Sequence, residues 1–195
     1  LVDFFYAPSW RWRDEPSVIQ NENEWQHALG LNLDHQFSDR FEAKVRENLN
    51  FTDDPSVEVD GSTLRRDSSF FLNRAGLSGI YRFDRRNSIE ASGQYDVKRY
   101  DNNEVADQSD EDRANAALNY WRQISPQNAV FAEARGSMFQ YSSVADVNRD
   151  FDAVYGILGA ERMFNPQTRG GLHAGVSSAE YDSEAIDSDT QPYGK

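Results

Sequence analysis

The stretch "LGLNLDHQFSDRFEAKVRENLNF", residues 29–51, decides the fold because apolar and polar residues alternate on both sides of a short turn at 38–40. Successive side chains of a β-strand point to opposite sides of the sheet, so this period of two predicts strands. The two runs therefore form a hairpin with one apolar face and one polar face. Either a protein core or lipid must cover the apolar face. That face contains Leu29, Leu31, Leu33, Phe37, Phe41, Ala43, Val45, Leu49 and Phe51.

The same alternation continues along the chain and predicts an all-β protein. Each predicted strand has roughly 12–16 residues, against about 5–6 in most soluble sheets. Long strands suit a tilted crossing of a bilayer, which needs about 9–11 residues within the hydrocarbon. The nine predicted strands are 2–13, 23–37, 41–53, 68–83, 88–100, 111–124, 128–141, 150–164 and 168–181, and "TQPYGK" at the end resembles the start of a tenth.

Short and long connections alternate strictly between these strands. The short ones are 37–41, 83–88, 125–129 and 164–169, and the longer, acidic ones are 14–22, 53–67, 101–112, 142–150 and 182–191. This alternation is typical of an up-and-down barrel whose two rims face different compartments. A β-propeller has a similar period but four short strands in each blade, so it is not expected. We predict one antiparallel up-and-down transmembrane β-barrel domain over residues 1–195, part of a larger barrel and incomplete at its C-terminus.

Composition narrows the functional classes. The formal net charge is −13, hydrophobic residues are 38% of the chain, and mean hydropathy is −0.80. A membrane barrel reconciles these values with regularly spaced aromatic residues, because only alternate residues of each strand need be apolar. The acidic balance disfavours nucleic acid, which requires a basic surface. The chain has no cysteine and no apolar run long enough for a transmembrane helix.

The two faces of the predicted strands receive different assignments. We expect the apolar face to contact lipid, with Glu47 as the exception on that face, and we expect aromatic residues beside the short turns to form an interfacial girdle. The charged residues of the opposite face would line the interior, where they either set the selectivity of an open pore or pair within a filled barrel. The lipid-facing candidates are Leu29, Leu31, Leu33, Ala43, Val45 and Leu49; the girdle candidates are Phe37, Phe41, Tyr81, Phe83 and Phe164; the pore-lining candidates are Glu42, Lys44, Arg46, Glu90, Asp96, Lys98, Glu133 and Arg135.

Three stretches carry a family resemblance: "LNLDHQFSDRFEAKVRENLNF", "IYRFDRRNSIEASGQYDVKRY" and "LNYWRQISPQNAVFAEARGSMFQY", together with the opening "FFYAPSWRWRDEP". With their aromatic residues beside Asp-Arg or Ser-Pro-x-Asn turns, they resemble a family of bacterial outer-membrane porins known as beta-barrel porin 2. The resemblance extends over essentially the whole chain. It implies a barrel in the outer membrane of a Gram-negative cell, with porin-like transport and, in some members, exopolysaccharide export.

No motif predicts an enzyme, a metal site or a cofactor. His27 and His35 are eight residues apart on one strand, roughly 26 Å, so they cannot share a metal ion. Nothing in the sequence brings His173 to Ser137 or Ser177, and no nucleophile elbow, P-loop or H-E-x-x-H is present. The acidic connections lack calcium-loop spacing, so solvated outer loops are expected there, with calcium binding left open.

Three functions remain open. The first is an outer-membrane channel for passive solute diffusion or polysaccharide export. The second is a non-conducting structural or surface-interaction barrel that acts through its acidic extracellular loops. The third is a soluble carbohydrate-binding β-sandwich, which the strand lengths and the asymmetry of the connections disfavour. The expected partners are outer-membrane lipid and lipopolysaccharide, with other envelope proteins as further candidates.

Overall fold

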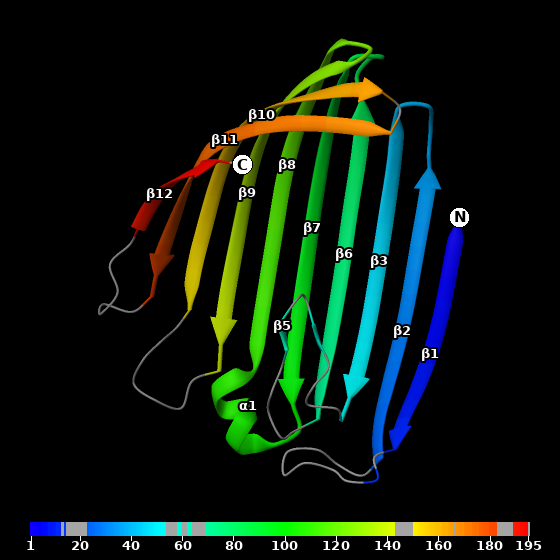
Figure 1. Ribbon diagram of the computed structural model, residues 1–195, viewed down its shortest axis with the longest axis vertical. Coiled ribbons are helices and arrows are strands. Elements are labelled where there is room, and N and C mark those ends of the chain that lie inside the picture. Colours follow the sequence, from blue (N-terminus) through cyan, green and yellow to red (C-terminus); the bar gives the residue numbers. More distant parts are fainter. Residues whose placement is uncertain are drawn as a thin grey trace.

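Ten strands form one antiparallel sheet in which each strand pairs with its neighbours in chain order (Figure 1). The computed structural model describes residues 1–12, 14, 23–53, 58–59, 62–63, 69–142, 150–165, 167–182 and 189–194. The sheet contains β1 (Val2–Trp12), β2 (Asn23–Gln36), β3 (Phe41–Thr52), β6 (Phe70–Arg82), β7 (Asn87–Tyr100), β8 (Glu111–Ser125), β9 (Asn128–Tyr141), β10 (Phe151–Asn165), β11 (Thr168–Tyr181) and β12 (Asp189–Gly194). The predicted all-β, up-and-down architecture is confirmed. Most of the connections predicted at 14–22, 53–67, 142–150 and 182–191 lies outside the described residues.

The sheet is strongly curved but open. Within the described chain β1 pairs with β2 alone and β12 with β11 alone. Figure 1 shows β10 and β11 bending across the sheet, while the two edge strands remain apart. The structure therefore shows a curved, open sheet of ten strands, and the larger barrel of which the sequence predicted this chain to be a part stays a prediction.

Strand register assigns each residue to one of two faces. Between β2 and β3, Leu31 lies opposite Glu47, and the next pair, Asn32 and Arg46, lies on the other face. The register is uninterrupted across most of the sheet. Its two irregularities, at Gln123/Ser125 and Met163/Asn165, both lie next to short turns. A regular register keeps same-face residues together across many strands.

Burial is the reverse of what a soluble sheet shows. Large apolar side chains on the outer face are exposed, including Leu77 at 60% and Leu158 at 67%. The buried hydrophobic residues of the described chain instead lie on the inner, concave face: Phe70, Leu72, Tyr100, Phe131, Ala153 and Ile157. Burying an apolar side chain of this size stabilises a protein in water by about 1.5–3 kcal/mol. The exposed side chains of the outer face gain this stabilisation only if another molecule or a lipid layer covers them.

A short helix, α1 (Asn103–Ser109), forms within a connection that the sequence predicted as a loop. Asn102 caps its first turn, because the Asn102 side chain accepts a hydrogen bond from the Glu104 backbone N–H at 3.0 Å. Val105 and Ala106 pack against the cluster of Phe70, Leu72 and Tyr100 at the long-connection end of the sheet. No helix within the described ranges is long and apolar enough to cross a membrane. The other described elements, β4 (Glu58–Val59) and β5 (Ser62–Thr63), pair with each other.

Candidate functional site

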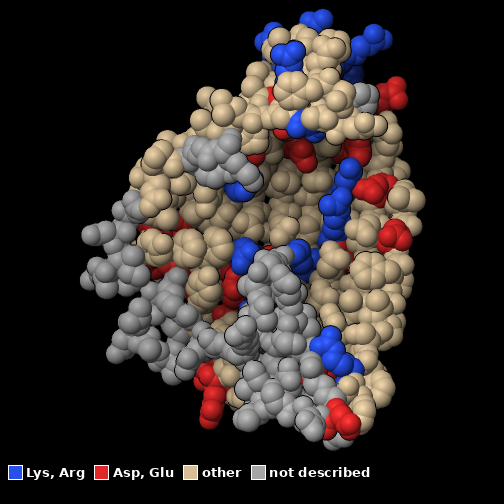
Figure 2. Space-filling model, in the orientation of Figure 1, with Lys and Arg blue, Asp and Glu red and all other residues tan. Residues whose placement is uncertain are grey.

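The centre of the concave face holds a polar groove of about 550 Å³ over β3 and β6–β9. Small and amide side chains such as Ser78, Ser92 and Asn115 form its floor, and charged side chains stand around them. Figure 2 shows positive and negative groups together in this hollow. All eight predicted pore-lining residues lie on the concave face: Glu42, Lys44, Arg46, Glu90, Asp96, Lys98, Glu133 and Arg135.

Several of these charges are paired along or across the strands. The Lys44 Nζ lies 3.1 Å from a Glu42 carboxylate oxygen, and Arg82 Nη2 lies 3.2 Å from the other oxygen of Glu42. Arg135 and Glu133, two residues apart on β9, are in contact at 2.5 Å. Because residues i and i+2 share a face of a strand, the alternation that defines the face also forms these pairs.

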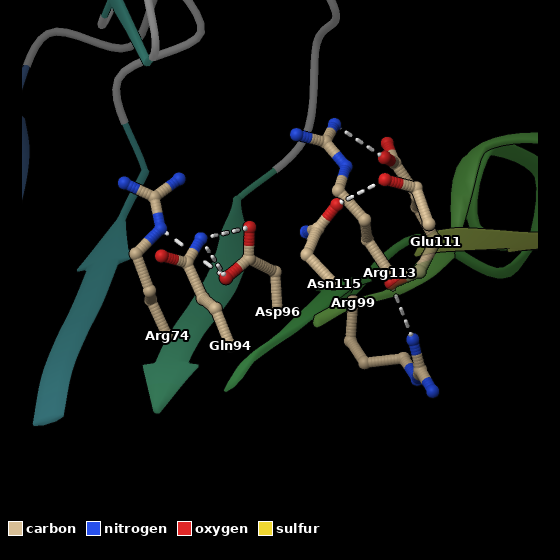
Figure 3. A network of polar contacts seen from close by, with 8 residues as sticks. Arg74, Gln94, Asp96, Arg99, Glu111, Arg113 and Asn115 are labelled. Atoms are coloured by element: carbon tan, nitrogen blue, oxygen red, sulfur yellow. Dashed lines mark hydrogen bonds and ion pairs between the residues drawn. The ribbon is translucent and has the colours of Figure 1, made fainter. Parts of the chain in front are cut away.

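Asp96 is the most deeply buried of the eight predicted pore-lining residues, with its side chain 9% exposed. Arg74, directly opposite on β6, donates from Nε to Asp96 Oδ1 at 3.2 Å. Gln94 donates from Nε2 to the two Asp96 oxygens at 2.9 and 3.2 Å (Figure 3). A buried carboxylate requires such partners, because an unpaired one loses its hydration without compensation. The network therefore fixes the Asp96 carboxylate in position and orients Arg74 beside it.

The polar network continues onto β8 and β9 (Figure 3). Arg113 Nη2 donates to Glu111 at 2.8 Å, and the Ser137 hydroxyl donates to Asn115 Oδ1 at 2.8 Å. The sequence interpretation did not select Arg74, Gln94, Arg113 or Asn115. The available signal for Arg74 is an unshifted register, which places it opposite Asp96 when residues are counted back equally from the Arg82–Ser88 pair beside the turn.

Two charged residues that line the groove differ from its other charged residues, Lys44, Arg74 and Arg135, in having no side-chain partner within the described chain. Within the described chain, neither Arg46 nor Glu90 makes a side-chain hydrogen bond or ion pair, and Arg46 is exposed. Both line the groove beside the small residues of β6 and β7. A charge without an internal partner acts on whatever ion or solute enters the groove. Arg46 and Glu90 are the groove residues best placed to do so.

The three histidines take part in ring packing. His27 stacks between Tyr6 and Trp25, and its Nδ1 lies 2.8 Å from the Tyr6 hydroxyl. His35 contacts Phe37 with ring centroids 4.3 Å apart. His173 packs edge-on against Phe131 with centroids 5.0 Å apart. No group of three potential metal ligands occurs among the described residues.

Ser137 and His173 do not form a hydrogen-bonded Ser–His pair. Ser137 donates its hydroxyl to Asn115, and His173 is directed at the ring of Phe131. The Phe131 ring lies over Gly159, where a Cβ would overlap it, and also packs against Trp121 at 4.6 Å. Trp121, Phe131 and His173 together line a second hollow of the concave face, of about 670 Å³.

The predicted lipid-facing residues all lie on the outer face, with Glu47 among them between Leu31 and Ala75. The girdle candidates are exposed at the short-turn end. Phe37 packs on Phe41 at 5.3 Å, and Tyr81 packs on Phe83 at 5.2 Å. Phe164, the fifth girdle candidate, is also exposed at this end. The outer-face residues predicted to contact lipid are Leu29, Leu31, Leu33, Ala43, Val45 and Leu49.

Asp84 organises the turn between β6 and β7 and makes that turn sensitive to pH. The backbone N–H of Arg86 and the side-chain amide of Asn87 donate to its carboxylate, and these bonds lower the pKa of Asp84 below its ordinary value. A lowered folded-state pKa adds stability above the unfolded pKa of about 3.9, and this stability is lost as pH falls through the folded-state pKa.

We therefore expect Asp84→Asn to flatten the acid limb of stability against pH below about pH 4. Urea unfolding of the folded protein between pH 2.5 and 7 measures this effect. Asp39→Asn is the control, because within the described chain the Asp39 carboxylate makes no hydrogen bond in the equivalent turn. Identical acid limbs for the Asp84 variant and the unmodified protein would contradict the assignment.

Comparison with protein-family models, with curated proteins and with solved structures gives no match to this chain.

Proposed function

We propose that this chain is a section of a porin-like β-barrel of the bacterial outer membrane, in which the polar groove forms part of the wall of an aqueous channel. The observation that carries the proposal is the outer face, whose large apolar side chains are exposed while the buried apolar residues lie inside. In water this arrangement is unfavourable, and in a bilayer it is the favoured one.

The height of the apolar surface supports the same conclusion. On β8 the outward residues between Asp112 and Arg122 are Ala114, Ala116, Leu118 and Tyr120. Ten residues span about 34 Å at about 3.4 Å each, and a strand tilt of about 35–45° reduces this to about 24–28 Å of height. The apolar band of outer-membrane barrels is about 25 Å tall. On β10, Asp152 and Arg162 enclose an equivalent apolar stretch.

The concave face supports a channel in particular. Its groove is floored by small residues, which leave space, and its walls carry charges of both signs. An all-β wall of this curvature encloses an open lumen when enough strands contribute, as in barrels of about 16–18 strands. The proposed location is the outer membrane, with lipid and lipopolysaccharide as contacts of the outer face. The short turns then face the periplasm and the acidic connections face outward.

Single-channel recording of the full-length protein in a planar bilayer tests this function. We expect discrete conductance steps and a reversal potential that shifts under a salt gradient. A protein that inserts and folds but passes no current would contradict the channel. That result would favour the non-conducting barrel, which acts at the cell surface through its acidic loops.

A further inference from the structure

Arginine side chains concentrate at the end of the sheet where the short turns lie. Figure 2 shows positive groups gathered at this upper end of the molecule. The turn between β6 and β7 contains Arg85 and Arg86 side by side, and Arg82 immediately precedes it. Arg169, at the start of β11, adds a fourth guanidinium from a different hairpin. This concentration contrasts with a formal net charge of −13 for the chain.

These four arginines line a single hollow of about 330 Å³ on the concave side of the short turns. Trp121 and Gln123 of β8 form part of its wall. The turn is fixed to that wall, because the Gln123 backbone N–H donates to the Arg86 carbonyl at 2.7 Å. The hollow therefore joins three adjacent hairpins and has a defined position in the fold.

The carboxylates of the hollow are already engaged. Asp84 accepts hydrogen bonds from the Arg86 backbone N–H at 2.7 Å and from the Asn87 side chain at 2.8 and 3.0 Å. Glu161 pairs with Arg169 at 3.6 Å. Neither the Arg85 nor the Arg86 side chain has a hydrogen bond or ion pair within the described chain. The hollow thus presents two guanidinium groups that make no hydrogen bond or ion pair within the described chain, and the one nearby carboxylate that attracts Arg86, Asp84, is held by the turn itself.

We propose that this hollow binds a multiply charged oxyanion of the phosphate class. A guanidinium group presents planar paired donors that match phosphate oxygens, and two adjacent groups match the charge of a phosphate dianion or phosphomonoester. The source is either a soluble phosphate compound near the channel mouth or the head group of an anionic phospholipid. Binding at this site does not require that the barrel conduct ions.

Binding to the detergent-solubilised full-length protein tests the proposal. Inorganic phosphate is titrated in one arm and short-chain phosphatidylglycerol in the other, at constant ionic strength held with chloride. The test variant is Arg85→Gln with Arg86→Gln. The matched control is Arg122→Gln, an exposed arginine at the same end of the sheet but on the outer face, outside the hollow. Loss of two charge-assisted bonds should weaken binding by at least about tenfold in the double variant and leave the control unchanged.

Saturable binding of phosphate that is weakened only in the double variant supports a site for soluble phosphate. Saturable binding of phosphatidylglycerol alone, weakened in the same variant, supports the same site and assigns it to a lipid head group. Absence of binding in both arms overturns the proposal. Equal weakening by Arg122→Gln also overturns it, because the interaction would then reflect overall charge. All four results are independent of the conductance measurement.

Discussion

Replacing Leu118 by arginine is expected to destabilise the folded protein in lipid by about 2–4 kcal/mol, the cost of a cation near the midplane of a transmembrane barrel. Leu118 is 49% exposed and lies near the middle of the apolar stretch that Asp112 and Arg122 enclose on β8. An arginine at this position loses its hydration in lipid. The free energy of unfolding, measured by denaturant titration in lipid vesicles, gives the magnitude.

Asn119 provides the matched control because it follows Leu118 on the same strand and lies on the concave face beside the polar groove. Arginine at residue 119 keeps access to water and should change the free energy of unfolding by less than about 1 kcal/mol. A large cost at 118 together with a small cost at 119 is the expected pair of results. Equal costs at both positions would show that the outer face does not contact lipid.

The strands were predictable because each carries a strict two-residue period and ends at a recognisable turn. The prediction for 23–37 and 41–53 differs by one residue at one end from β2 (Asn23–Gln36) and β3 (Phe41–Thr52). Face assignments followed for the same reason, since a slip by one residue would reverse every side chain. These features depend on local sequence alone, so no knowledge of distant contacts was needed.

The two-residue period could not predict whether the edge strands of the sheet meet, nor could it predict the helix α1. Whether β1 meets another strand depends on curvature accumulated over the whole sheet, which no single strand encodes. The helix depends on tertiary contact, because Val105 and Ala106 are its links to the cluster around Phe70. A seven-residue helix has little stability without such packing. The acidic composition of its segment indicated only a solvated loop.

The sequence predicted which face of the sheet the groove residues lie on, but only some of the pairs they form across neighbouring strands. Equal counting from the Arg82–Ser88 pair beside the turn matches Arg74 with Asp96, because the β6–β7 register is regular. The same counting on β8 and β9 fails by one residue, because the bulge between Gln123 and Ser125 shifts the register. The hydrogen bond between Ser137 and Asn115 therefore depends on this bulge, which the sequence pattern does not predict.

Reversing the charge at Arg46 is expected to shift the ion selectivity of the proposed channel toward cations. Arg46 is exposed in the groove and has no side-chain partner within the described chain, so its field is not cancelled locally. A unit charge acts on an ion about 4 Å away with about 1 kcal/mol in water. Arg46→Glu changes the charge by two units, so at this distance it favours a cation by about 2 kcal/mol, or about thirtyfold, and disfavours an anion equally, and the cation-to-anion permeability ratio rises. Reversal potentials under a salt gradient measure this ratio.

Three further variants separate a local electrostatic effect from a change of structure. Arg46→Gln should shift selectivity in the same direction by a smaller amount, and Glu90→Gln should shift it toward anions. Glu47→Gln changes the adjacent residue, which lies on the outer face, and should leave selectivity unchanged. Because screening weakens each effect as ionic strength rises, the shifts should diminish from about 0.1 to about 1 M salt. A selectivity that responds equally to residues 46 and 47 would place the ion path elsewhere than along the groove.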